Sequence, residues 1–237
     1  DGGFRSDIWD ENTIKLDGMS GNDFSWAIGS RKQSWNYSGG ADPDAGRYLT
    51  TAELIEICET AKEYHIDIIP SFDTPAHVDW ITTTYAEQVA AGNTSIKTFK
   101  YNGTTYTLPN TIHYNNGYSA LNLANNSVKN LAFAMYNDMA VFFKVYAGST
   151  KFNIGGDELG LYSSSGYTYT DVYNYINDVN KVMKKHDYTS RVYNDFFYRK
   201  TTVDNYSKIF QTNAQLDSDI EVVIWTADGS YTAPPSQ

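Results

Sequence analysis

Apolar residues recur at helical spacing in three segments of the chain. The first segment begins at Thr50, and Glu53 follows three residues later, which is the capping-box pattern that starts a helix. The second segment covers about 126–146 and the third about 170–186. A stripe of this kind is most often the face that packs on a core. The pattern therefore predicts three amphipathic helices and assigns them no chemistry.

Each predicted helix has its own apolar positions. The first stripe consists of Leu54, Ile57, Cys58 and Ala61. The second consists of Val128, Leu131, Ala132, Met135, Met139, Phe142, Phe143 and Tyr146. The third consists of Val172, Tyr175, Ile176, Val179, Val182 and Met183.

Short runs typical of β-strands lie between these helices. They are residues 66–70, 151–154, 191–194 and 221–225. Alternation of strand and helix predicts parallel strands that are covered by helices. Each run leads into polar or aromatic residues, and the carboxyl ends of parallel strands are where active sites lie in such α/β folds.

Two stretches interrupt the alternation. Residues 79–125 form a connection far longer than usual, which predicts a long loop, and it includes a hairpin with a turn at Asn102 and Gly103. Residues 6–49 are rich in Gly, Asp, Asn and Ser, and we interpret them as an elaborated loop of the same domain.

Composition narrows the possible partners. The 18 basic and 28 acidic residues give a net charge of −10, which argues against a nucleic-acid-binding surface. The single cysteine, Cys58, excludes an internal disulfide and a cysteine-based zinc site. No uncharged apolar run reaches the roughly 18 residues that cross a bilayer, so we expect no membrane insertion. Aromatic residues reach 15%, led by 20 tyrosines whose flat faces and hydroxyls suit sugar rings, although most such rings pack in cores.

The sequence Phe-Asn-Ile-Gly-Gly-Asp-Glu at residues 152–158 is the strongest indication of chemistry. Neighbouring side chains on a regular strand point to opposite faces, so Asp157 and Glu158 serve one substrate only if the backbone bends. Gly155 and Gly156 permit that bend. Two adjacent carboxylates raise one pKa, as a general acid requires, but the same residues also suit a plain turn after a strand.

A second group of polar residues follows the first predicted strand. Pro70 and Pro75 rigidify the turn that carries Asp73 and His77. A single histidine in a turn is more often a hydrogen-bonded structural residue than a catalytic one.

Together these two segments resemble glycoside hydrolase family 20, the β-N-acetylhexosaminidases. Residues 152–158 match the family's strand-4 motif, and residues 69–77 match its strand-3 motif Ile-Pro-Glu-x-Asp-x-Pro-Gly-His except at Ser71 and Ala76. Residues 191–195 resemble strand 5 of the Gram-positive cell-surface branch, and residues 223–225 resemble strand 6. The likeness runs through nearly the whole chain in the family's order.

The resemblance implies a (β/α)8 TIM-barrel catalytic domain, of which the sequence places strands 3 to 6. Strands 1, 2, 7 and 8 are not found. We therefore expect residues 1–237 to be a partial glycoside hydrolase domain.

The resemblance also implies roles for individual residues. Glu158 would be the general acid and base, and Asp157 would orient the substrate's acetamido group. His77 would support the acid, with Asp1 as the candidate carboxylate behind it. No metal or organic cofactor is implied.

The remaining implied residues line the sugar. Tyr193 and Trp225 would form apolar walls of the pocket. Asn194 and Asp195 would contact sugar hydroxyls, although either could equally cap the next turn.

Three functions are consistent with this sequence. The first is a retaining exo-β-N-acetylhexosaminidase acting on a glycan or oligosaccharide by substrate-assisted catalysis. The others are a lacto-N-biosidase of the same family and a non-catalytic sugar-binding fragment. The acidic balance and a glycan substrate favour an extracellular or cell-surface location, and the sequence leaves the oligomeric state open.

Overall fold

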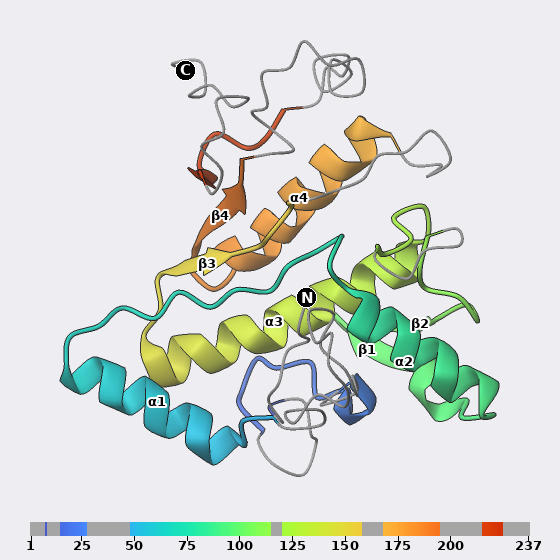
Figure 1. The fold of residues 1–237 in the computed structure, drawn as a ribbon, viewed down its shortest axis with the longest axis horizontal. Helices are drawn as coiled ribbons and strands as arrows, with labels where there is room; N and C mark the ends of the chain where they lie inside the picture. The colour runs from blue at the N-terminus through green and yellow to red at the C-terminus, as the bar shows by residue number, and fades with distance from the viewer. Residues whose placement is uncertain are drawn as a thin grey trace, which may run out of the picture.

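The computed structural model describes residues 8, 15–27, 48–114, 120–157, 168–194 and 215–224. Helix α3 (Asn126–Ala147) crosses the middle of the molecule, with α1 (Thr51–Glu63) packed along one side and α4 (Tyr169–Lys184) along another (Figure 1). These are the three helices that the apolar stripes predict. None of the described helices is long and apolar enough to cross a bilayer.

Side chains fix where the three helices begin. Thr50 and Glu53 form the predicted capping box of α1, and Thr168 and Asp171 form a second one at α4. The side chain of Asn125 accepts hydrogen bonds from two backbone N–H groups in the first turn of α3. The orphan donors of each first turn are thus partly satisfied within the chain.

One position of the predicted stripes is wrong. Ile57 is 45% exposed, whereas Leu54 and Cys58 are buried. Ile57 stands about 60° from Leu54 around the helix, since one residue turns the helix by about 100°. It therefore lies at the margin of the face that α1 packs on α3.

Three strands form a parallel sheet. Its order is β3 (Lys151–Asn153), β4 (Thr189–Tyr193) and β5 (Glu221–Val223). These strands confirm the last three runs predicted from the sequence, each within a few residues.

The predicted strand at 66–70 is wrong as a regular strand. Only Ser71 makes a parallel bridge, to Asn153 of β3. This register sets residues 66–68 opposite 148–150, where the chain leaves α3 through Gly148 in the left-handed conformation. No strand backbone is available there, and the Ser149 hydroxyl donates to the Ile68 carbonyl instead.

The long connection contains a helix that the sequence analysis placed within a loop. Helix α2 (Asp79–Ala90) buries Thr82 and Thr84 together with aromatic residues, so its inner face does not stand out as apolar. The Thr84 hydroxyl donates to the Trp80 carbonyl four residues earlier, which removes the cost of burying it. Beyond α2 and the 3-10 helix η2 (Ser95–Lys97), the predicted hairpin is confirmed.

The hairpin pairs β1 (Thr98–Tyr101) with β2 (Thr104–Thr107) through an Asn-Gly turn in which both residues have positive φ. Of the predicted loop at 6–49, the structure describes residues 8, 15–27 and 48–49, which include the 3-10 helix η1 (Ser25–Ala27). The rest of that stretch lies outside the described residues.

The two faces of the parallel sheet differ in character. Phe152 and Val192 are fully buried, and the Phe152 ring packs edge-on against Tyr136 of α3. Alternate residues point the other way. There, Lys151 Nζ lies 2.6 Å from Glu221 Oε1, and Arg191 Nε lies 3.3 Å from Glu221 Oε2.

Candidate functional site

The parallel register brings the ends of three neighbouring segments together. Asn153 pairs with Ser71 on one side and with Arg191 on the other. Two residues further along these segments are Asp73, Gly155 and Tyr193. The Tyr193 N–H donates to the Gly155 carbonyl at 2.9 Å, and the Gly156 N–H donates to Asp73 Oδ1 at 3.0 Å.

The chain bends where β3 ends, as the two glycines predict. Gly155 and Gly156 have φ values of 73° and 86°, and the Asn153 side chain accepts the Gly155 N–H at 3.1 Å. A Cβ atom on Gly155 would overlap the Asp73 carboxyl group and lie 2.6 Å from Asp73 Cα. The bend needs glycine for its backbone conformation and for this close approach.

The bend gathers two carboxyl groups and an imidazole. His77 Nε2 lies 3.8 Å from Asp157 Oδ2 and 4.0 Å from Asp73 Oδ2. All three side chains offer ligand atoms within 4.8 Å of one another, and each is partly buried. Within the described part of the chain, this is the set of side chains that could hold a metal ion.

A proton shared by the two carboxyl groups can offset their repulsion just as a metal ion could. Burial, together with a hydrogen bond to Asp157 and the Asp157 charge, raises the pKa of Asp73 to about 9, against the opposing effect of the Gly156 N–H. At neutral pH Asp73 is therefore the protonated member of the pair. Asp157 Oδ1 is buried and meets no conventional donor among the described residues, so the Asp73 proton is well placed to satisfy the Asp157 carboxylate.

The structure brings together only some of the residues that the sequence singled out. His77 and Asp157 meet at the bend, and Tyr193 and Asn194 lie at the end of β4 beside it, with Asn194 buried. The other four candidates lie outside the described residues: Asp1, Glu158, Asp195 and Trp225.

Asp73 is a site residue whose importance the sequence does not reveal. The sequence places it on the turn with His77 and indicates no role of its own. The available indication was its position four residues before His77 in a segment held by two prolines. Its raised pKa could not be anticipated, because that depends on contact with Asp157, 84 residues later in the chain.

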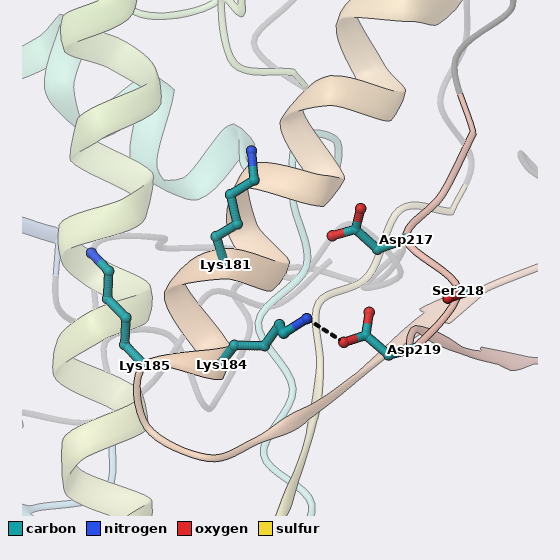
Figure 2. A pocket seen from close by; sticks show the side chains of 6 residues that line it. All are labelled: Lys181, Lys184, Lys185, Asp217, Ser218 and Asp219. Carbon is teal, nitrogen blue, oxygen red and sulfur yellow. Dashed lines mark hydrogen bonds and ion pairs between the residues drawn. The ribbon is translucent and has the colours of Figure 1, made fainter.

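A second group of charged side chains lies away from this site. Figure 2 shows a shallow groove lined by residues at the end of α4 and by the loop before β5: Lys181, Lys184, Lys185, Asp217, Ser218 and Asp219. The groove is at the amino ends of β4 and β5, whereas the bend is at the carboxyl ends. In parallel α/β folds the amino-terminal edge contributes to stability and the carboxyl-terminal edge to chemistry.

Charges in this groove already have partners within the chain. Lys184 forms an ion pair with Asp219, and the buried Asn180 donates to both Asp217 and Asp219. These contacts hold the loop before β5 against helix α4.

Comparison with known proteins shows which family the chain resembles. The family model for the glycosyl hydrolase family 20 catalytic domain matches residues 14–232. Among similar solved structures, the pneumococcal virulence factor StrH is 21% identical, with a TM-score of 0.54 over 82% of this chain and 43% of that chain. Dispersin B is 19% identical, with a TM-score of 0.53 over 86% of this chain and 52% of that chain.

A mutant Streptomyces plicatus β-hexosaminidase, solved in complex with the product GlcNAc, is 18% identical. Its TM-score is 0.55, and the match covers 96% of this chain and 36% of that chain. This chain therefore spans about a third to a half of the length of these three solved chains. The likeness supports the predicted TIM-barrel fold, of which the described residues contain three strands and no closed barrel.

Replacing Gly155 with alanine tests the close approach at the bend. We expect Gly155→Ala to lower the free energy of unfolding by about 2–4 kcal/mol, because positive φ and overlap with Asp73 act together. Gly103→Ala is the matched control, since Gly103 has a φ of 75° and nothing within 4 Å of an added Cβ. Urea unfolding measures both, and equal losses would show that contact with Asp73 is not a constraint.

The pH dependence of stability tests the protonation of Asp73. Because folding raises the pKa of Asp73 from 3.8 to about 9, its contribution to stability is fully present below about pH 4 and is lost as the pH rises through about 9. Asp73→Asn cannot ionise, and its amide can still donate to Asp157 and accept from Gly156. We therefore expect wild type to lose stability relative to Asp73→Asn as the pH rises from about 5 to about 9.

Urea unfolding across that pH range provides the measurement. The control is Asp17→Asn, which changes an exposed carboxylate, and its difference from wild type should stay nearly constant. A constant difference for Asp73→Asn as well would contradict a proton held at Asp73.

Proposed function

The chain belongs to glycosyl hydrolase family 20, and we propose that the protein carrying it is a retaining exo-β-N-acetylhexosaminidase. It would remove terminal β-linked N-acetylglucosamine or N-acetylgalactosamine from a glycan or oligosaccharide, outside the cell or at its surface. The observation that carries the proposal is the cluster of Asp73, His77 and Asp157 just after β3, in which the two carboxyl groups share a hydrogen bond. A β-hexosaminidase among the similar solved structures supports it.

The pairing suits Asp157 to stabilise positive charge. In substrate-assisted hydrolysis the 2-acetamido oxygen attacks the anomeric carbon, and positive charge develops on the resulting oxazolinium ring. The Asp157 carboxylate would accept a hydrogen bond from the acetamido N–H and stabilise that charge. A neutral Asp73 leaves the pair with one negative charge, which avoids repulsion and holds Asp157 in a fixed orientation.

Glu158 would supply the proton transfers. It would protonate the glycosidic oxygen as the bond to the leaving group breaks, and the resulting carboxylate would then remove a proton from the incoming water. Water would attack the anomeric carbon from the face that the leaving group vacated, so the product would retain its β-configuration.

The neighbouring residues would place the sugar and the two carboxyl groups. His77 lies within 4.0 Å of both Asp73 and Asp157 and would support the catalytic acid Glu158. Tyr193 and Trp225 would form apolar walls, Asn194 and Asp195 would contact hydroxyls, and Asp1 would stand behind His77. These assignments follow the resemblance to the family.

Replacing Glu158 tests the general acid. We expect Glu158→Gln to lower kcat/KM by about 10²–10⁴-fold on substrates with poor leaving groups. Activated aryl N-acetyl-β-glucosaminides should lose much less, because their leaving groups need little protonation. Steady-state kinetics on both substrates make the measurement, and equal losses would favour a structural role for Glu158.

Replacing Asp157 tests the stabilisation of the oxazolinium ring. Asp157→Asn should lower turnover by about 10²-fold or more, and it should also weaken binding of a thiazoline that mimics the ring. Calorimetry measures the thiazoline affinity, with a near-ultraviolet circular dichroism spectrum as the folding control. Unchanged affinity in a folded variant would contradict the role of Asp157.

The products identify the kind of enzyme. Lacto-N-tetraose should be left without release of the disaccharide lacto-N-biose, whereas chitobiose should give N-acetylglucosamine. Release of lacto-N-biose would identify a lacto-N-biosidase, and the absence of hydrolysis of both would favour a sugar-binding fragment.

A further inference from the structure

A chain of three buried hydroxyl groups lies directly behind the paired carboxyl groups. Tyr136 of α3, Tyr175 of α4 and Thr74 are all at most 1% exposed. The Thr74 hydroxyl lies 2.8 Å from both the Tyr136 and the Tyr175 hydroxyls. Side chains of the central helix and of α4 therefore meet at the residue that follows Asp73.

The hydrogen bonds along this chain run in one direction. The Tyr136 hydroxyl donates to the carbonyl of Phe72 at 2.6 Å and also lies 3.1 Å from that of Ile154. Its single proton is then committed, so Thr74 donates to Tyr136, and Tyr175 donates to Thr74. Burial raises the pKa of Tyr136 and of Tyr175 well above the ordinary value, so each keeps its proton.

Tyr136 stands where a backbone hydrogen bond of the sheet is missing. In a regular parallel pair, the Gly155 N–H would continue the ladder to the Phe72 carbonyl. That N–H instead donates to the Asn153 side chain, as the bend requires. The Tyr136 hydroxyl donates to Phe72 in its place and contacts the carbonyl of Ile154 as well.

One phenol thus joins the two segments that carry the carboxyl groups. Phe72 immediately precedes Asp73, and Ile154 precedes the two glycines before Asp157. The Tyr136 ring is held between neighbouring aromatic rings, with centroids 4.7 Å from Phe72 and 5.9 Å from Phe152. The hydroxyl and the ring therefore hold both backbones at a fixed separation.

We propose that Tyr136, supported by Thr74 and Tyr175, is a positioning residue that sets the separation of Asp73 and Asp157. The proposal rests on the proposed function, because that separation decides whether Asp157 is held ready for the acetamido group. Removing the Tyr136 hydroxyl leaves the ring in place and releases the link between the two backbones. The effect should fall on the chemical step, since Asp157 acts on charge that develops in the transition state.

The first test compares two tyrosines that each donate to a buried backbone carbonyl. We expect Tyr136→Phe to lower kcat on an aryl N-acetyl-β-glucosaminide by about 10- to 100-fold, with KM changed less than about threefold. Tyr188→Phe is the matched control, because the Tyr188 hydroxyl donates to the carbonyl of Ala140 at 2.9 Å, away from the carboxyl pair. Its kcat should stay within about twofold of wild type, and equal effects of the two changes would overturn the proposal.

Thr74 offers a second test that does not depend on how Tyr136→Phe folds. Thr74→Val keeps the shape and removes the hydroxyl, whereas Thr74→Ser keeps the hydroxyl. We expect Thr74→Val to lower kcat by about tenfold and Thr74→Ser to retain most of it. Equal kcat values for the two variants would overturn the proposal.

A titration separates this inference from the proposed function. Carboxyl-carbon NMR of aspartate-labelled protein follows the Asp73–Asp157 pair without any substrate. We expect the raised pKa of Asp73 to fall in Tyr136→Phe, because the contribution of Asp157 weakens as the two carboxyl groups separate, and to remain unchanged in Tyr188→Phe. A wild type that hydrolyses no N-acetylhexosaminide would disprove the proposed function alone, whereas an unchanged titration in Tyr136→Phe would overturn the positioning role.

Discussion

Two carboxyl groups can stay in contact inside a protein only when a proton or a cation offsets their repulsion. Asp73 and Asp157 meet this constraint with a proton, because burial and the neighbouring Asp157 together raise the pKa of Asp73 to about 9. Much of the local structure serves that contact. The glycines allow Asp73 to approach the bend, the Gly156 N–H binds Asp73, and His77 lies within 4.0 Å of both carboxyl groups.

The contact is local, but its support comes from distant parts of the chain. Tyr136 reaches it from the central helix and Tyr175 from the helix after β3, and they meet at Thr74. Sheet hydrogen bonds end at the bend, so side chains take over the connection between the two segments. The hydrophobic core thus serves the site as well as stability, since two of its largest buried side chains are these tyrosines.

Sequence reasoning succeeded where local chemistry decides structure. Capping residues and one-sided stripes located three helices, and an Asn-Gly pair located the hairpin turn. It failed for α2, whose inner face includes threonines and so does not stand out as apolar. It also failed where partners are distant, since residues 66–68 lie opposite a turn at 148–150 instead of a strand. The role of Asp73 depends on contact with Asp157, which is far away in the sequence. Tyr175 lies in a predicted core stripe, and nothing in the sequence shows that its hydroxyl bonds to Thr74.

The hydrogen bond of Asn153 limits which residues position 153 can carry if the bend is to form. Its side chain is 8% exposed and accepts the Gly155 N–H with an oxygen that carries no formal charge. An aspartate there would accept the same hydrogen bond but would add a further negative charge near the Asp73–Asp157 pair, which repulsion disfavours. Alanine would leave the Gly155 N–H free to restore the regular ladder and straighten the turn. Position 153 therefore favours a neutral, short acceptor in this chain even though Asn153 touches no substrate atom in the proposed reaction.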